Sequence, residues 1–194
     1  MMSIQILQPL LDDSDVKNSF IISSVLSDTV DVNTDQLLTE AFECVEDGNY
    51  SDALKLYDLV LRHDHTNIRA LVDKGVTLQN MGRIKSALTS YDKALSISPD
   101  NIDAWINKGA ALHSDQKYLE AIDCYDTVLG IDKKCTMALA YKGLSLGEMD
   151  NLQEAIKYFK KALSIDKYHD LANISKQTAQ DLLKSIKKNK SKIQ

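Results

Sequence analysis

The chain has 194 residues, a formal net charge of −5, 44% hydrophobic residues and 26% charged residues. These values are those of a globular protein and exclude collagen-like and wholly disordered chains. With seven glycines, two prolines and 6% aromatic residues, the chain is poor in the turn signals that a sheet-rich fold needs, so the composition favours an all-α protein.

Composition also bears on the compartment. The N-terminal residues have no basic stretch before an apolar core, and no segment approaches ~18 uninterrupted apolar residues, so we expect neither a signal peptide nor a membrane span. Cys44, Cys124 and Cys135 form no C-x-x-C pair and suit a reducing compartment, which predicts a cytoplasmic protein. The mild acidity argues against a dedicated nucleic-acid binder.

Residues 1–33 form an acidic N-terminal segment with five aspartates, one lysine and apolar clusters at 4–11 and 20–26. The terminal position and the Ser/Asp content favour a flexible segment or a loosely docked helix. In the alternative interpretation, the second cluster is the apolar face of a helix that occupies a groove of this protein.

From Thr34 onwards the sequence repeats every 34 residues, which predicts four units at 34–67, 68–101, 102–135 and 136–169. Small residues occupy the eighth and twentieth places of the units, and aromatic residues occupy the twenty-fourth. In unit order these are Ala41, Gly75, Gly109 and Gly143; Ala53, Ala87, Ala121 and Ala155; and Tyr57, Tyr91, Tyr125 and Phe159. Alternating small and large side chains are typical of closely packed helices.

Each unit contains two runs of apolar residues at helical spacing, separated by a polar break such as Gly82-Arg83 or Gln116-Lys117. Each unit is therefore predicted to be a hairpin of two antiparallel helices.

These columns resemble the tetratricopeptide repeat, whose pattern is W-x-x-L-G-x-x-Y followed by A-x-x-x-F, A and P. Residues 68–101 match it best, with Gly75, Ala87, Tyr91, Ala94 and Pro99, whereas the first unit has Ala41 in place of the glycine. The resemblance implies an α-solenoid over 34–169.

Residues 170–194 follow the last unit. Their apolar residues lie at near-helical spacing, which predicts a capping helix, and the last eleven residues hold five lysines and no acid. We interpret this Lys-rich end as a solvated tail, with weak attraction to nucleic acid or an acidic partner as the alternative.

No grouping of nucleophile, base and orienting residue is recognisable, and no glycine-rich phosphate motif occurs. His63 and His65 flank Asp64 at a predicted helix end, where a solvated turn is a simpler interpretation than a metal site. The sequence thus predicts a protein that is not an enzyme and has no cofactor and no metal.

The resemblance implies that the first helices line a concave groove built from places 2, 5, 6, 9, 12 and 13 of each unit. The predicted partner-binding residues of this groove are Leu38, Phe42, Arg69, Val72, Asp73, Val76, Asp103, Ile106, Asn107, Tyr141 and Leu144. Apolar side chains at the fifth and ninth places, together with mostly acidic charges, predict a protein partner with apolar anchors and basic flanks. Alternatively, the fifth and ninth places pack between adjacent first helices.

Some proteins of this family hold acidic chaperone tails with a clamp of Lys, Asn and Arg in the groove. Here the corresponding residues of units two to four are Val72, Val76, Asn107, Met137 and Tyr141, and only Asn107 matches. We therefore predict that this chain does not bind such tails.

The favoured function is that of an adaptor or scaffold that binds a peptide or helix of another protein in the groove. The alternative is a self-associating structural protein whose groove holds its own N-terminal segment.

Overall fold

The described part of the chain consists of antiparallel helices. The computed structural model describes residues 33–193, with residues 185–193 described by their backbone alone, and no strand occurs in this range. The predictions for residues 1–32, including the alternative that they occupy the groove, lie outside it. The helices are α2 (Thr34–Glu46), α3 (Tyr50–His63), α4 (Ile68–Asn80), α5 (Ile84–Ile97), α6 (Ile102–Ser114), α7 (Tyr118–Ile131), α8 (Thr136–Glu148), α9 (Leu152–Ile165) and α10 (Asp170–Ile193).

Helix bounds recur with the 34-residue period, so the first helix of every unit begins at the first place and the second helix at the seventeenth. Asn67 and Asn101 cap α4 and α6, because each side-chain oxygen accepts a hydrogen bond from the backbone N–H three residues later, at 2.9 and 2.7 Å.

The turn inside each unit has a left-handed residue at the fifteenth place. The φ angles are 76° at Gly48, 72° at Gly82, 61° at Gln116 and 59° at Asp150. Each of these residues donates its backbone N–H to the carbonyl oxygen three residues earlier, at 2.8–3.0 Å. This αL turn ends the first helix and confirms the polar breaks as the points where the chain reverses.

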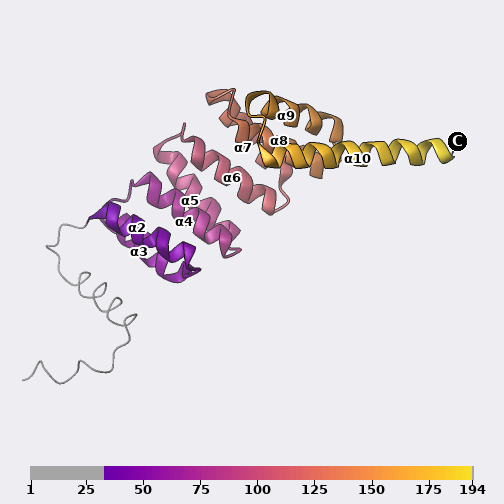
Figure 1. Cartoon of the computed structure of the whole chain (residues 1–194). Coiled ribbons are helices and arrows are strands. Elements are labelled where there is room, and N and C mark those ends of the chain that lie inside the picture. The colour runs from indigo at the N-terminus through magenta and orange to yellow at the C-terminus, as the bar shows by residue number, and fades with distance from the viewer. Residues whose placement is uncertain (1–32, 194) are drawn as a thin grey trace, which may run out of the picture. The chain divides into compact units, whose positions relative to one another are not determined.

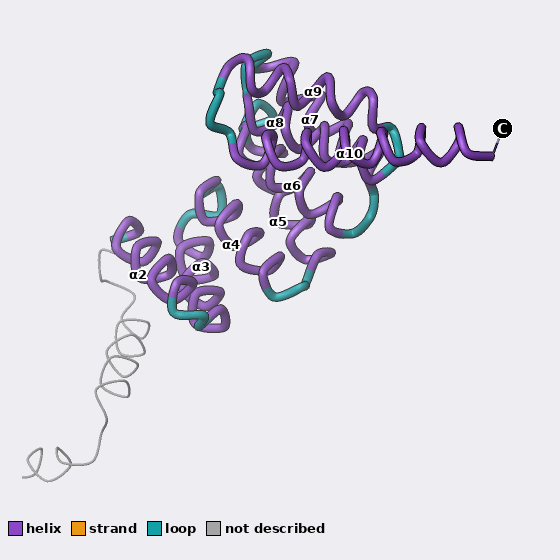
Figure 2. Tube along the Cα trace, turned by 45° about the vertical axis from the view of Figure 1, so that its right-hand side comes forward, coloured by secondary structure: helices purple, strands orange, loops and turns teal. Residues whose placement is uncertain are grey.

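The helices form two layers. In α4–α9 the two helices of a unit pack on each other, and each second helix packs on the first helix that follows it, from α3 on α4 to α9 on α10. The first helices α4, α6, α8 and α10 also contact one another in order. Figures 1 and 2 show these hairpins following one another, joined by short loops. The predicted all-α solenoid is confirmed.

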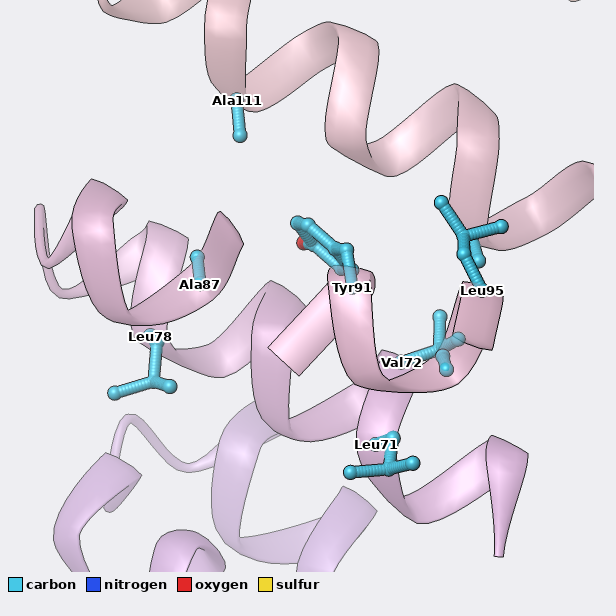
Figure 3. Packing of buried hydrophobic residues seen from close by; sticks show 9 residues of the cluster. Leu71, Val72, Leu78, Ala87, Tyr91, Leu95 and Ala111 are labelled. Atoms are coloured by element: carbon cyan, nitrogen blue, oxygen red, sulfur yellow. The ribbon is translucent and has the colours of Figure 1, made fainter. Parts of the chain in front are cut away.

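The aromatic residue of each second helix packs on the small residue of the first helix in the same unit. A Cβ atom added to Gly109 would lie 2.5 Å from Tyr125 Cε1, and one added to Gly143 would lie 2.6 Å from Phe159 Cε1. Figure 3 shows Tyr91 in the middle of the corresponding cluster of unit two. The glycines at the eighth place, Gly75, Gly109 and Gly143, therefore allow close approach of the helices and do not form turns.

Ion pairs connect consecutive units. The twenty-fifth place of one unit holds an aspartate that pairs with the lysine at the seventh place of the next unit. The pairs are Asp58–Lys74, Asp92–Lys108, at 2.7 Å, and Asp126–Lys142. We call this series the ion-pair ladder.

The helix α10 is the C-terminal helix expected after the last unit. None of the helices in the described residues is both long enough and apolar enough to cross a membrane.

Candidate functional site

The predicted groove residues lie on α2, α4, α6 and α8, of which α4, α6 and α8 contact one another in order and form one layer. We call their side chains at places 2, 5, 6, 9, 12 and 13 the first-helix face. Its members differ in exposure, and this decides which of them are able to contact a partner.

The fifth place belongs to the core. Leu38, Val72 and Ile106 are 2%, 8% and 7% exposed, and each is part of a cluster of buried residues. Val72 lies beside Tyr91 in Figure 3. These three side chains pack between helices and offer almost no surface to a partner, as the alternative interpretation of the fifth place expects.

The ninth place remains accessible. Phe42 is 58% exposed, and Val76 and Leu144 are half-buried. Tyr141, at the sixth place, is also half-buried and stacks on Tyr125, with ring centroids 5.8 Å apart. The apolar surface of the first-helix face is therefore made by the ninth place, Tyr141, the half-buried Val45 at the twelfth place and Met137 at the second place, which is 46% exposed.

Two acidic side chains lie on this face at units two and three. Asp73 is half-buried and lies 3.6 Å from the guanidinium of Arg69, while Asp103 is exposed and Asn107 is half-buried. Burial raises the pKa of Asp73; Arg69 opposes this shift and Asp103 adds to it. Because burial disfavours the ionised form of Asp73, a further positive charge nearby would stabilise this carboxylate.

A histidine at a place that the sequence assigned to the groove, His113, connects units three and four. His113 Nδ1 lies 2.9 Å from Ser145 Oγ, and its ring meets that of Tyr118 edge-on, with centroids 5.2 Å apart. Burial lowers the pKa of His113, and Glu148 partly opposes this. His113 occupies the twelfth place and Ser145 the tenth place of the next unit, so only knowledge of how adjacent first helices pack would have paired them.

The described residues contain two kinds of reactive group, metal-ligating side chains and cysteine thiols. No three of their His, Cys, Asp or Glu side chains are grouped so that they could hold a metal ion. Burial raises the pKa of the Cys124 thiol to about 11, so this thiol is protonated at neutral pH and poorly nucleophilic.

Comparison with known families and structures identifies related proteins. Residues 102–135 and 138–177 match the family described as Tetratricopeptide repeat, and residues 80–116 match TPR repeat. No curated protein sequence matches the chain significantly.

Several solved structures share the fold. The structure of MamA protein is 22% identical, with a TM-score of 0.66 over 76% of this chain and 81% of that chain. MamA 41-end from Desulfovibrio magneticus RS-1 is 23% identical, with a TM-score of 0.63 over 82% and 96%. A tetratricopeptide repeat protein from Parabacteroides merdae is 21% identical, with a TM-score of 0.68 over 78% of this chain and 60% of that chain. The second match of the Tetratricopeptide repeat family ends at residue 177, inside α10.

Proposed function

Because the chain belongs to the tetratricopeptide repeat family, we propose that it is a non-enzymatic adaptor that binds a peptide or helix of another protein on the first-helix face. Arrays of such repeats present extended surfaces that hold partners. The fold by itself does not identify the partner, so its chemistry is inferred from the side chains.

One observation carries the proposal: accessible apolar side chains lie on the same face as Asp73, which Arg69 neutralises in part from 3.6 Å, and the exposed Asp103. Phe42 is mostly exposed, Val76 and Leu144 are partly so, and Asp73 and Asp103 lie on the helices between the first and the last of them. Exposed apolar side chains next to acidic groups favour a partner with apolar anchors and basic flanks.

The same charges bear on the acidic chaperone tails. A partner carboxylate at units two and three would face Asp73 and Asp103, and the buried Val72 gives it no donor. We expect no binding of an acidic C-terminal peptide, and micromolar affinity in calorimetry would contradict this.

The test uses full-length protein as bait for affinity capture from a cell extract, followed by mass spectrometry. Phe42→Asp and Leu144→Asp each place a charge on the first-helix face and should abolish capture of the genuine partner. Leu119→Asp is the matched control, because Leu119 is 66% exposed on the second helix α7. A partner lost with Leu119→Asp but retained by both face variants would refute the proposal.

The electrostatic part is tested with the captured partner by calorimetry. Asp73→Asn combined with Asp103→Asn should weaken binding about tenfold and reduce its dependence on salt, since two attractive charges are removed. Unchanged affinity would show that the acidic groups play no part in recognition.

A further inference from the structure

The helix α10 takes the position of a fifth first helix. Ala172 and Ala179 are buried at its third and tenth places, as Ala104 and Ala111 are in α6. The backbone N–H of Ala172 donates to His169 Nδ1 at 3.4 Å, at the place where Asn67 and Asn101 cap α4 and α6. The packing register therefore continues from α9 into α10.

The ion-pair ladder stops at this junction. The three preceding junctions pair an aspartate with a lysine. Between α9 and α10 the same two places hold Lys160 and Lys176. Two cations therefore replace an ion pair, although the helices keep their register.

A cleft of about 500 Å³ lies between α9 and α10 on the side of Lys160. Its lining combines two aliphatic side chains, two amides and three lysines: Ile156, Leu183, Gln153, Gln180, Lys157, Lys160 and Lys184. Lys157 and Lys184 pair with Glu154 and Asp181 on their own helices, at 2.7 and 3.2 Å. Among the described side chains, no carboxylate lies within ion-pairing distance of Lys160.

The composition of this cleft indicates a protein ligand. Its aliphatic residues suit an apolar side chain, and its lysines suit carboxylates. None of the described side chains that line it is aromatic, whereas nucleic-acid grooves commonly stack bases on aromatic rings.

The other end of the array has the complementary surface. Phe42 of α2 is 58% exposed. The exposed Asp35 and Glu46 lie on its side of the helix, and the exposed Glu43 lies at the edge of this surface. Residue i+4 borders a helical side chain, residue i−7 lies two turns away on the same side, and residue i+1 lies about 100° around the helix. Residues 34–67 contain eight acidic and two basic residues. An apolar side chain with acidic neighbours thus matches an apolar cleft with basic neighbours.

We propose that α2 of one copy of this chain docks into the α9–α10 cleft of a second copy. Phe42 covers Ile156 and Leu183, and the carboxylates beside it face the lysines of the cleft. The contact joins two different surfaces, so it is a head-to-tail interface that leaves one free end at each side and allows further copies to add.

Sedimentation velocity of the full-length chain over a concentration series tests this proposal. At low salt the average mass should rise with concentration, and at high salt it should return to that of the monomer, because screening weakens exposed ion pairs. Lys160→Glu with Lys184→Glu should weaken association about tenfold or more. The control Lys133→Glu with Lys134→Glu makes the same charge change between α7 and α8 and should associate like the wild type.

A mixing experiment establishes the head-to-tail geometry. Glu43→Lys with Glu46→Lys reverses the α2 surface and should also be monomeric. Mixed with the Lys160→Glu, Lys184→Glu variant, it should associate again, because each docking surface then meets one of opposite charge. Circular dichroism checks that the variants keep the helical content of the wild type.

A wild-type chain that stays monomeric at every concentration would overturn the proposal, as would a mixture that fails to associate. The cleft lies outside the first-helix face, so the Lys160→Glu, Lys184→Glu variant should still capture the partner of the proposed function. Phe42 and Glu46 belong to both proposed surfaces, so the cleft variant, and not a variant of α2, distinguishes the failure of one proposal from the failure of the other.

Discussion

At the residue scale, the turn inside each unit needs a left-handed backbone conformation. Gly48 and Gly82 adopt it without a steric penalty, whereas Gln116 and Asp150 adopt it with a side chain present. Aspartate tolerates this conformation better than glutamine does, because its short polar side chain bonds locally. Gln116 is therefore the least suited of the four turn residues.

We predict that Gln116→Gly raises the free energy of unfolding by about 0.5–1 kcal/mol. Glycine removes the steric cost of the left-handed conformation, and this gain exceeds the entropic cost of making the unfolded chain more flexible. Urea denaturation followed by circular dichroism measures the change. Asp150→Gly serves as comparison and should gain less. A loss of stability in Gln116→Gly would mean that its side chain contributes more than its backbone conformation costs.

The glycines at the eighth place, inside the first helices, are needed because there is no space for a side chain, and not because of their backbone conformation. Gly109→Ala should lower the free energy of unfolding by about 1–2 kcal/mol, because a Cβ would lie 2.5 Å from the Tyr125 ring and overpacking costs more than the better helix propensity of alanine returns. Gly130→Ala is the matched control in α7, where an added Cβ meets nothing within 4 Å. It should stabilise the protein, and equal effects of the two substitutions would contradict this account.

At the element scale, polar contacts between successive units specify how their helices meet. The ion-pair ladder joins α3 to α4, α5 to α6 and α7 to α8, and the His113–Ser145 contact joins α6 to α8. The aspartates of the ladder are about half exposed, so each pair contributes modestly to stability. The more informative contact is that of His113, because it depends on pH.

We predict that acidification from pH 7 to pH 5 destabilises the α6–α8 contact. Burial lowers the pKa of folded His113, so the unfolded chain binds the proton more readily and stability falls as the pH drops below about 6.5. Thermal unfolding at several pH values should show a smaller loss for His113→Gln than for the wild type. His65→Gln, which changes an exposed histidine in the turn after α3, should keep the wild-type loss.

At the scale of the whole molecule, each hairpin contacts only its neighbours, so stability is a sum of unit and interface contributions. Helix α2 has no repeat before it within the described residues, and residues 34–67 hold eight acidic residues against two basic ones. The interior helices have partners on both sides.

Hydrogen exchange should therefore be slowest in α5–α8 and fastest in α2 and in the part of α10 beyond Lys184. Mass spectrometry of peptides from full-length protein, labelled at concentrations where it is monomeric, measures these rates. Uniform protection from α2 to α10 would indicate a single cooperative unit instead.

The amino-acid sequence by itself determined the period, the two helices of each unit and the helix-packing role of Gly75, Gly109 and Gly143. These features are periodic, because the two helices of every unit pack together through the same residue types at the same places. The turn at the fifteenth place was recognisable for the same reason, even where Gln116 and Asp150 replace glycine.

Only the tertiary structure decided which groove residues are accessible. Leu38 and Phe42 are four residues apart, so helical periodicity puts them on one face, yet Leu38 is buried and Phe42 is exposed. The position of the neighbouring helix makes this difference, and no local pattern encodes it. The ion-pair ladder and the α9–α10 cleft also depend on contacts between units. They emerge only when the helices pack, because side chains far apart in the sequence form them.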